Sequence, residues 1–193
     1  RAAVLDTPRP VYVGDRSPAE AWEDRALPIG LGQTISQPSL VAQMTELLEI
    51  RPGETVLDVG TGSGYQAAIL GRLAARVFSM ECLPPLARLA RRNWARDPGV
   101  GPHVHAVIAD AYLGFPGAIQ FDAAVVAAAA REVPVPLLEQ IAPGGRVVAP
   151  LGPPGLQQLV RLRRLRGGWK REELGMCAFV PLVRNGAGGP RYP

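Results

Sequence analysis

Three carboxylates and a run of glycines occur where successive predicted strands end. Asp58 stands just before residues 60–64 (GTGSG), Glu81 ends a second apolar run, and Asp110 ends a third. Glycines in such a turn let backbone N–H groups approach a ligand and let the following helix pack on the strand. Because the carboxyl ends of parallel strands lie at one edge of a sheet, we expect the three carboxylates to face a common ligand.

The glycine run alone fits several nucleotide-binding folds, and two details narrow the choice. The dinucleotide fingerprint G-x-G-x-x-G requires glycine at position 65, where the chain has Tyr65. A carboxylate beside the turn repels a pyrophosphate but attracts an ammonium group, such as the one that S-adenosylmethionine carries on its methionine end. We expect Glu81 to accept hydrogen bonds from both ribose hydroxyls and Asp110 to hold the adenine amino group. The alternative is that Asp58 and Asp110 only cap loops.

A parallel sheet is needed to bring these residues together, and the order of segments predicts one. From about Thr55, strand-like and helix-like segments alternate, which is typical of an α/β domain. We therefore expect a single domain with a three-layer, doubly wound, mostly parallel sheet of the Rossmann-like type. The expected strands are 55–59, 76–81, 103–110, 121–126 and 145–150, and the expected helices are 37–49, 66–75, 84–96 and 135–141.

The last third of the chain predicts a hairpin followed by a tail. Segments 157–165 and 176–182 have the pattern of two strands, connected through a glycine turn and a charged segment. Residues 185–193 are rich in glycine and proline, so we expect a mobile tail.

Composition excludes several classes of protein. With 193 residues, a mass of 20.5 kDa and 47% hydrophobic residues, the chain has the size and core of one folded domain. Cys82 and Cys177 are too few for a disulfide framework, and the longest apolar run, residues 123–130, is too short to span a bilayer. No targeting segment is visible. These features predict a cytoplasmic protein without a membrane partner.

The basic residues allow two interpretations. The net charge is +4, Lys170 is the one lysine among 21 basic residues, and arginines cluster in 88–96 and 161–171. Such clusters could form a nucleic-acid-binding surface, or they could be solvated faces of helices and strands. Because aromatic residues around them are sparse, we favour the solvated faces and do not expect nucleic acid as the partner.

One family matches these motifs together with several further segments. Its pattern is found in residues 27–38 (LPIGLGQTISQP), 44–48 (MTELL), 59–67 (VGTGSGYQA), 143–146 (PGGR) and 179–182 (FVPL). Over about residues 8–183 the chain resembles the protein-L-isoaspartate O-methyltransferases. The resemblance implies an N-terminal segment, 1–26, without most of the family's first helix, an S-adenosylmethionine-dependent methyltransferase domain, 27–183, and a tail, 184–193.

The resemblance also implies an activity and a set of site residues. A methyl group passes from S-adenosylmethionine to the α-carboxyl of an L-isoaspartyl residue in a damaged peptide or protein, leaving S-adenosylhomocysteine. The ester then closes to a succinimide, which initiates repair. Ser36 matches the active-site serine, and we expect a monomer without a metal. The implied cofactor positions are Thr34, Ile35, Asp58, Gly60, Thr61, Gly62, Gly64, Glu81, Cys82, Asp110 and Ala111. The implied substrate positions are Ser36, Ala127, Ala128, Ala129, Val180, Pro181 and Leu182.

Three alanines depart from the family pattern. Ala109 and Ala111 flank Asp110 where the family usually has glycines, and Ala127 stands where it often has threonine. A methyl group at position 111 would crowd the adenine edge or require a negative φ. These departures leave open a relative that methylates a defined aspartate in one peptide or protein partner. A cofactor-binding protein without catalytic activity is a further alternative.

The expected chemistry needs no general base. A carboxylate nucleophile, with a pKa of about 4, is already ionised at neutral pH. The protein must align it with the methyl carbon and the sulfonium sulfur and exclude water. Ser36 could donate a hydrogen bond that orients one carboxylate oxygen; alternatively, it is only the N-cap of the helix that follows, with Pro38 in the first turn. His103 and His105, two apart in a predicted strand, have no third ligand nearby, which argues against a metal site.

Overall fold

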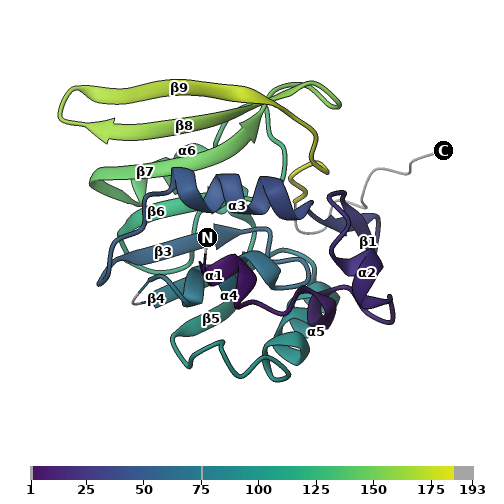
Figure 1. Cartoon of the computed structure of the whole chain (residues 1–193). Helices are drawn as coiled ribbons and strands as arrows, with labels where there is room; N and C mark the ends of the chain where they lie inside the picture. The colour runs from purple at the N-terminus through teal and green to yellow at the C-terminus, as the bar shows by residue number, and fades with distance from the viewer. Residues whose placement is uncertain (1, 75, 185–193) are drawn as a thin grey trace.

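A seven-stranded sheet forms the centre of the molecule (Figure 1). The computed structural model describes residues 2–74 and 76–184. The strand order is β5-β4-β3-β6-β7-β8-β9; β3 to β7 run parallel, and β8 is antiparallel to both of its neighbours. The strands are β3 (Thr55–Val59), β4 (Arg76–Glu81), β5 (Val104–Ile108), β6 (Phe121–Val126), β7 (Ile141–Leu151), β8 (Gln157–Leu165) and β9 (Gly168–Cys177).

The direction in which the chain crosses the sheet changes between β3 and β6. From β3 the chain winds outward through β4 to β5, and it then returns to the other side of β3 as β6. Val59 pairs with Met80 on one side and with Val126 on the other. In open α/β sheets this switch point leaves a crevice at the carboxyl ends of the strands, and the glycine turn follows β3 at that place.

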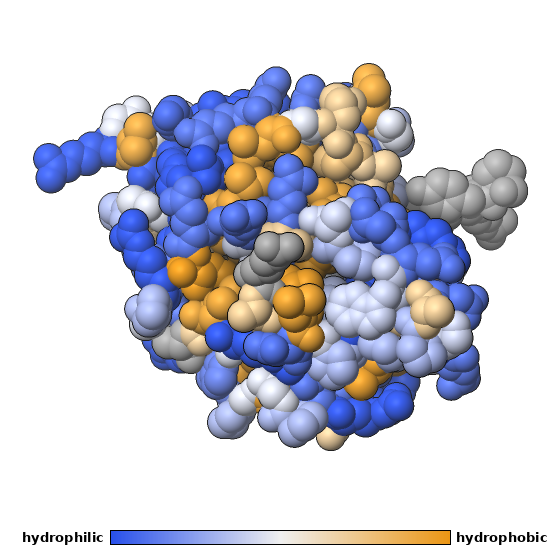
Figure 2. Space-filling model, in the orientation of Figure 1, coloured by the Kyte–Doolittle hydropathy of each residue, from blue (hydrophilic) through white to orange (hydrophobic). Residues whose placement is uncertain are grey.

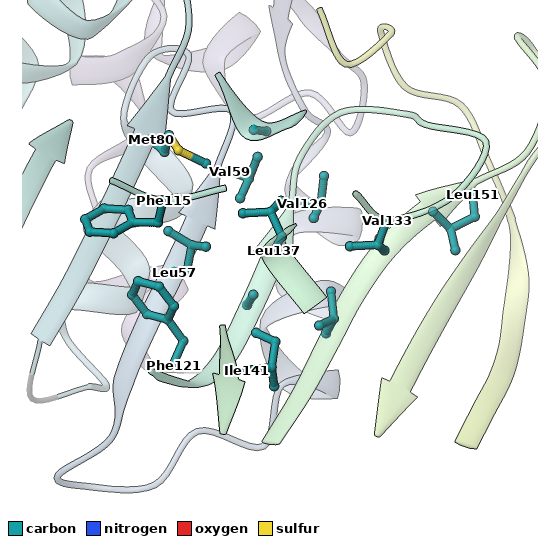
Figure 3. Close-up of a cluster of buried hydrophobic side chains, with 14 of the residues drawn as sticks. Leu57, Val59, Met80, Phe115, Phe121, Val126, Val133, Leu137, Ile141 and Leu151 are labelled. Atoms are coloured by element: carbon teal, nitrogen blue, oxygen red, sulfur yellow. The ribbon is translucent and has the colours of Figure 1, made fainter. Parts of the chain in front are cut away.

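Alternate residues of β3 belong to different cores. Leu57 and Val59 join one cluster, and Figure 3 shows Phe115 and Phe121 beside Leu57. The elements η2 (Ala111–Leu113) and α6 (Val135–Glu139) contribute to this cluster. Val56 joins the second cluster, together with α3 (Pro38–Leu47) and α4 (Tyr65–Gly71). Burial on both faces explains the continuous apolar strands and confirms the predicted three-layer, doubly wound, mostly parallel α/β fold.

The residues before the sheet pack against α4 and α5 (Pro84–Trp94). They form α1 (Ala2–Leu5), η1 (Arg9–Tyr12), α2 (Pro18–Ala21) and the hairpin of β1 (Leu27–Gly30) and β2 (Gln33–Ile35). The hydroxyl of Tyr12 donates a hydrogen bond to the buried Asp97 carboxylate at 2.6 Å, and Arg72 pairs with the same carboxylate at 2.6 Å. These contacts tie η1 to the C-terminal ends of α4 and α5.

The face of the molecule in Figure 2 is mostly hydrophilic, with apolar side chains gathered near its middle. An open groove lined by residues of α1 and α3 contributes to this apolar surface. Leu5 and Trp22, which also line it, are 71% and 40% exposed. The groove shares no lining residue with the cleft described below.

The structure corrects the predicted start of α3. The helix begins at Pro38 with Gln37 as its N-cap, so the alternative that Ser36 is only the N-cap is wrong. The carboxylate of Asp24 instead accepts a hydrogen bond from the backbone N–H of Ser39 at 2.9 Å. Pro38 does stand in the first turn, as the sequence indicated.

Two strand predictions are also wrong in part. The strand β9 spans the charged segment itself, Gly168–Cys177, whereas 178–182 does not continue as a strand. His103 precedes β5, and its Nε2 atom is hydrogen-bonded to the carbonyl of Gly71 at 2.6 Å. The two histidines therefore do not share a strand. The predicted mobile tail, 185–193, lies outside the described residues.

Candidate active site

A cleft opens at the carboxyl ends of β3, β4 and β6, at the switch point of the sheet. It contains about 520 Å³ of empty space, a figure that includes open solvent at its mouth. The structure brings together here residues that are far apart in the sequence. The predicted site residues that line the cleft are Thr34, Gly60, Gly62, Glu81, Cys82, Ala111, Ala127, Ala128, Val180, Pro181 and Leu182.

A smaller hollow of about 400 Å³ adjoins the cleft on the side of the β1–β2 hairpin. The cleft and the hollow share Thr34, Gly60, Gly62 and Ala127 in their walls. The two spaces therefore adjoin, with the glycine turn between them. The predicted residues that line only the hollow are Ile35, Ser36 and Thr61.

The glycine turn is held between the hairpin and α5. Gly62 and Gly64 have φ values of 54° and 90°, a region that side chains disfavour. A Cβ atom at Gly64 would lie 2.5 Å from the indole nitrogen of Trp94, and one at Gly62 would lie 3.3 Å from Ile29. The indole N–H donates a hydrogen bond to the carbonyl of Gly64 at 2.9 Å. Any side chain at position 64 would therefore displace α5 from the turn.

Asp58 lies beneath the turn rather than in the wall of the cleft. Its side chain is fully buried, and its Oδ2 atom accepts a hydrogen bond from the Ser79 hydroxyl at 2.7 Å. The hydroxyl oxygens of Ser79 and Thr61 are also 2.7 Å apart. The Oδ1 atom has no hydrogen-bond partner in the described part of the chain. Burial, assisted by the nearby charge of Glu81, raises the pKa of Asp58 to about 7 despite the Ser79 hydrogen bond.

Glu81, at the end of β4, connects the turn to the start of α5. One carboxylate oxygen accepts a hydrogen bond from the backbone N–H of Gly62 and the other from that of Leu83, both at 2.9 Å. A carboxylate has about four acceptor positions, so Glu81 can still accept hydroxyl donors from the cleft. Burial, together with the charge of Glu81, raises the pKa of the adjacent Cys82 to about 11, which keeps this thiol neutral.

The third carboxylate, Asp110, caps a short helix. Its Oδ1 atom accepts a hydrogen bond from the backbone N–H of Tyr112 at 2.9 Å, as the loop-capping alternative for this residue requires. Ala111 begins η2 and lines the cleft. Among the described non-glycine residues, only Leu31 and Glu49 have a positive φ, so the backbone accepts alanine at 111 without strain. Alanine in place of the family's glycine at position 111 therefore changes the shape of the cleft wall.

Ser36 lines the hollow and is partly buried. Its hydroxyl has no hydrogen bond to another described residue. Because Ser36 does not cap α3, its hydroxyl is available to a group bound in the hollow. The β1–β2 hairpin positions it, with Leu31 and two glycines in left-handed conformations at the tip.

The far wall of the cleft consists of two segments that pair through their backbones. The N–H of Ala129 donates to the carbonyl of Val180 at 2.8 Å, and the N–H of Leu182 donates to the carbonyl of Ala129 at 2.7 Å. Ala129 therefore joins the two segments without lining the cleft, whereas Ala127 and Ala128 do line it. In the residues that follow, the guanidinium carbon of Arg184 lies 4.2 Å from the ring centre of Tyr112.

Several residues of the site carry no signal in the sequence. Ser79 and Trp94 contact the motif only through the tertiary structure, and Asn93 donates to the carbonyl of Ser63 at 2.8 Å. Their side chains are ordinary for a strand or a helix, so only the fold reveals their role. Apolar residues that line the cleft and were not predicted are Val59, Met80, Leu83, Leu86 and Val183.

Among residues 2–74 and 76–184, no three of the histidines, cysteines, aspartates and glutamates are arranged to hold a metal ion. Within the same range no helix is both long and apolar enough to cross a membrane.

The family model and two curated relatives match this chain under the same family name. The family model for protein-L-isoaspartate(D-aspartate) O-methyltransferase matches residues 1–187. The chain is 50% identical to a protein-L-isoaspartate O-methyltransferase of Methanoculleus marisnigri, over 94% of this chain and 82% of that protein. It is 47% identical to a protein of the same name from Methylorubrum extorquens, over 95% of this chain and 81% of that protein.

Solved structures share the fold. A beta-aspartate methyltransferase of Plasmodium falciparum, solved in complex with S-adenosyl-L-homocysteine, superposes with a TM-score of 0.83 at 24% identity, covering 95% of this chain and 89% of the other. A further protein-L-isoaspartate O-methyltransferase structure gives 0.84 at 27% identity, covering 95% and 61%. The match of the family model and the two relatives shows that this chain belongs to the protein-L-isoaspartate(D-aspartate) O-methyltransferase family.

Proposed function

We propose that the cleft and the hollow together catalyse methyl transfer from S-adenosylmethionine to the free α-carboxyl of L-isoaspartyl residues in damaged proteins or peptides. Closure of the ester to a succinimide then initiates repair. The observation that carries this proposal is the glycine turn at the sheet's switch point, with Glu81 on one side and Ser36 on the other, in a chain of this family.

The residues present fit S-adenosylmethionine. Asp58 has a buried oxygen without a partner among the described residues, Glu81 has acceptor capacity toward the cleft, and the positive φ of Gly60 and Gly62 leaves their N–H groups without covering side chains. We propose that Glu81 holds the ribose hydroxyls, that Ala111 and Cys82 border the adenine, and that Asp58 attracts the ammonium group. The remaining proposed contacts are Thr34, Ile35, Thr61, Gly64 and Asp110.

When bound, the cofactor supplies an electrophilic methyl group on a sulfonium ion. The chain's own task is to bind and orient the substrate carboxylate, which is ionised at neutral pH and needs no base. We propose that the Ser36 hydroxyl donates to one carboxylate oxygen and leaves the other to attack. The apolar wall formed by Ala127, Ala128 and Pro181 excludes water from the nucleophile, which strengthens this hydrogen bond.

The departures from the family pattern favour a second candidate function, methylation of a defined aspartate in one peptide or protein partner. Ala127 replaces a hydroxyl-bearing side chain in the substrate wall, and the cleft lining at Ala109 and Ala111 carries extra methyl groups. Labelled methyl transfer to paired peptides, identical except for an isoaspartyl or an aspartyl residue, decides between the two. The repair function predicts label on the isoaspartyl peptide alone. Preference for the ordinary aspartate would replace it with the second function.

We also propose a monomer in the cytoplasm that acts on peptides rather than on nucleic acid. Four of the five arginines between residues 161 and 171 are engaged within the protein. Arg161 pairs with Glu49 and Glu172, and Arg163 pairs with Glu49. Arg171 pairs with Glu173, and Arg164 donates to the carbonyl of Ile141. Guanidinium groups that are already paired contribute less to phosphate binding. The division into segments 1–26, 27–183 and 184–193 likewise stays a prediction.

A further inference from the structure

The far wall of the cleft is followed directly by an exposed arginine. Residues 180–183 all line the cleft, and Arg184 comes next in the chain. Backbone hydrogen bonds to Ala129 fix this segment as far as Leu182. Two residues of chain span at most about 7 Å, so the backbone of Arg184 lies close to the end of the proposed substrate wall.

An aromatic ring holds the guanidinium group of Arg184 in place. The guanidinium carbon lies 4.2 Å from the ring centre of Tyr112, which is within the range of a cation–π contact. Tyr112 belongs to η2, whose first residue, Ala111, also lines the cleft. Its hydroxyl donates a long hydrogen bond to the carbonyl of Leu182 at 3.4 Å. Tyr112 therefore contacts the segment of Arg184 twice and keeps this cation at the rim of the cleft.

The charge of Arg184 is not paired within the described part of the protein. Among residues 2–74 and 76–184, no carboxylate lies within 4.0 Å of its guanidinium group. The residues that follow it in the sequence, 185–193 (NGAGGPRYP), include no aspartate or glutamate. A guanidinium group that stacks on a ring keeps its N–H donors in its own plane, where they match the two oxygens of a carboxylate. The rim of the cleft therefore presents an oriented cation to a ligand with a carboxylate.

We propose that Arg184, held on the ring of Tyr112, binds an acidic side chain of the substrate peptide two or three residues from the isoaspartyl residue. The inference rests on the proposed function, because it takes residues 180–182 as a wall of the substrate site. A peptide that lies along this wall passes the guanidinium group where the wall ends, and the two-residue step from Leu182 to Arg184 sets the spacing. Arg184 thus gives the enzyme a preference for isoaspartyl sites with an aspartate or glutamate nearby.

Methylation kinetics of two pairs of isoaspartyl peptides test this preference. Within a pair the peptides differ only in glutamate or glutamine, placed two residues before the isoaspartyl residue in one pair and two residues after it in the other. An exposed ion pair contributes up to about fivefold in affinity. We expect wild type to favour glutamate by up to about that factor in kcat/KM in one pair or both, and to lose this preference at high salt. The difference should appear in KM, because the contact is remote from the reacting carboxylate. Equal kcat/KM within both pairs would overturn the inference.

Four variants assign the preference to the stacked arginine. Arg184→Met should abolish it and Tyr112→Leu should reduce it, whereas Tyr112→Phe, which keeps the ring, should retain it. Arg131→Met is the matched control: Arg131 is also exposed and follows the other segment of the far wall, 127–130, but in the described part of the chain it has no ring contact. A preference that persists in R184M, or one that R131M loses to the same extent, would overturn the inference.

The same assays separate this inference from the proposed function. If wild type methylates none of the isoaspartyl peptides, the proposed function fails and the inference fails with it. If wild type methylates all of them equally well, only the role of Arg184 is wrong. Calorimetric binding of S-adenosylhomocysteine should be the same for R184M and wild type. Weaker binding by R184M, with equal losses of kcat/KM for the glutamate and glutamine peptides, would show that Arg184 only fastens the wall of the cleft and would overturn its assignment to the substrate.

Discussion

At the scale of single residues, Asp58 gives the site a pH dependence. Its pKa of about 7 lies above the usual 3.8, so the folded state binds the proton more tightly than the unfolded state. This stabilisation is complete below about pH 4 and is lost as the pH rises through 7. Asp58→Asn should therefore reduce the fall in melting temperature between pH 5 and pH 8, measured by calorimetry. A fall as steep as that of the wild type would show that another group is responsible.

The same titration should appear in cofactor binding. An ammonium group is attracted only by the ionised carboxylate, whose fraction rises about tenfold between pH 6 and pH 8 for a pKa of 7. We expect the affinity for S-adenosylhomocysteine to rise by up to about that factor in the wild type and to stay flat in D58N. Parallel profiles for the two proteins would contradict the assignment of Asp58 to the ammonium group.

The effect of Ser36 on catalysis can be measured separately from its effect on the free energy of unfolding. Because Gln37 is the N-cap of α3 and Ser36 makes no capping bond, Ser36→Ala should change the free energy of unfolding by less than about 0.5 kcal/mol. Loss of a hydrogen bond to a charged carboxylate should lower kcat/KM by about tenfold or more. Ser39→Ala, on the same helix, controls for the substitution. Normal turnover in S36A would remove Ser36 from the catalytic site.

At the scale of elements, the packing of α5 against the glycine turn determines the shape of the site. Gly64→Ala places a methyl group against Trp94 at a φ of 90°, whereas Gly53→Ala has nearly the same φ of 92° with nothing within 4 Å. Both substitutions place a side chain in a left-handed backbone conformation, which costs about 1–2 kcal/mol. We expect G64A to be less stable than G53A by at least a further 1–3 kcal/mol, measured by denaturant unfolding. Equal stabilities would show that α5 adjusts freely.

The elements also show how far the sequence could predict this structure. The strands β3, β4 and β6 match their predicted ranges because most of their residues are buried, which places apolar side chains on both faces of the sheet. The range predicted from the sequence for β9 starts too late, because this edge strand, GWKREELG, exposes most of its side chains and has no apolar signal. The capping of α3 by Asp24, fifteen residues upstream, follows from the tertiary arrangement.

The residues of the candidate site also differ in whether the sequence alone could predict them. The positions of the glycine turn and Glu81 follow from the local sequence, and the segments around Ser36, Ala127 and Val180 follow from the family pattern. Ser79 and Trp94 meet the turn from other elements, so their polar atoms acquire a role only through the fold. β5 ends at Ile108, so Asp110 follows the strand instead of ending it, and its side chain caps η2.

At the scale of the whole molecule, Arg146 connects the sheet to the elements that carry the site. It forms two hydrogen bonds to Glu54, at 2.7 Å and 2.6 Å, and it also donates to the carbonyls of Leu48, Glu49 and Asp122. Arg146 is 5% exposed, so removing it leaves Glu54 without its partner. Arg146→Met should lower the free energy of unfolding by about 3–5 kcal/mol.

The exposed pair of Arg171 and Glu173 provides the comparison. Arg171→Met should change the free energy of unfolding by less than about 1 kcal/mol, because surface ion pairs contribute little. Chemical denaturation of the two variants measures both effects. A cost for R146M as small as that for R171M would show that the buried network does not hold β7 to α3 and β3.

At the same scale, we expect the glycine turn, Glu81 as ribose acceptor and Ser36, brought together at one switch point, to methylate isoaspartyl carboxyls. A competition measures it most directly, with S-adenosylmethionine and an equimolar mixture of one peptide in its isoaspartyl and aspartyl forms, followed by mass spectrometry. We predict that the isoaspartyl form alone acquires the methyl ester and then converts to the succinimide. Methylation of the aspartyl form at an equal or greater rate, or of neither form, would contradict the claim.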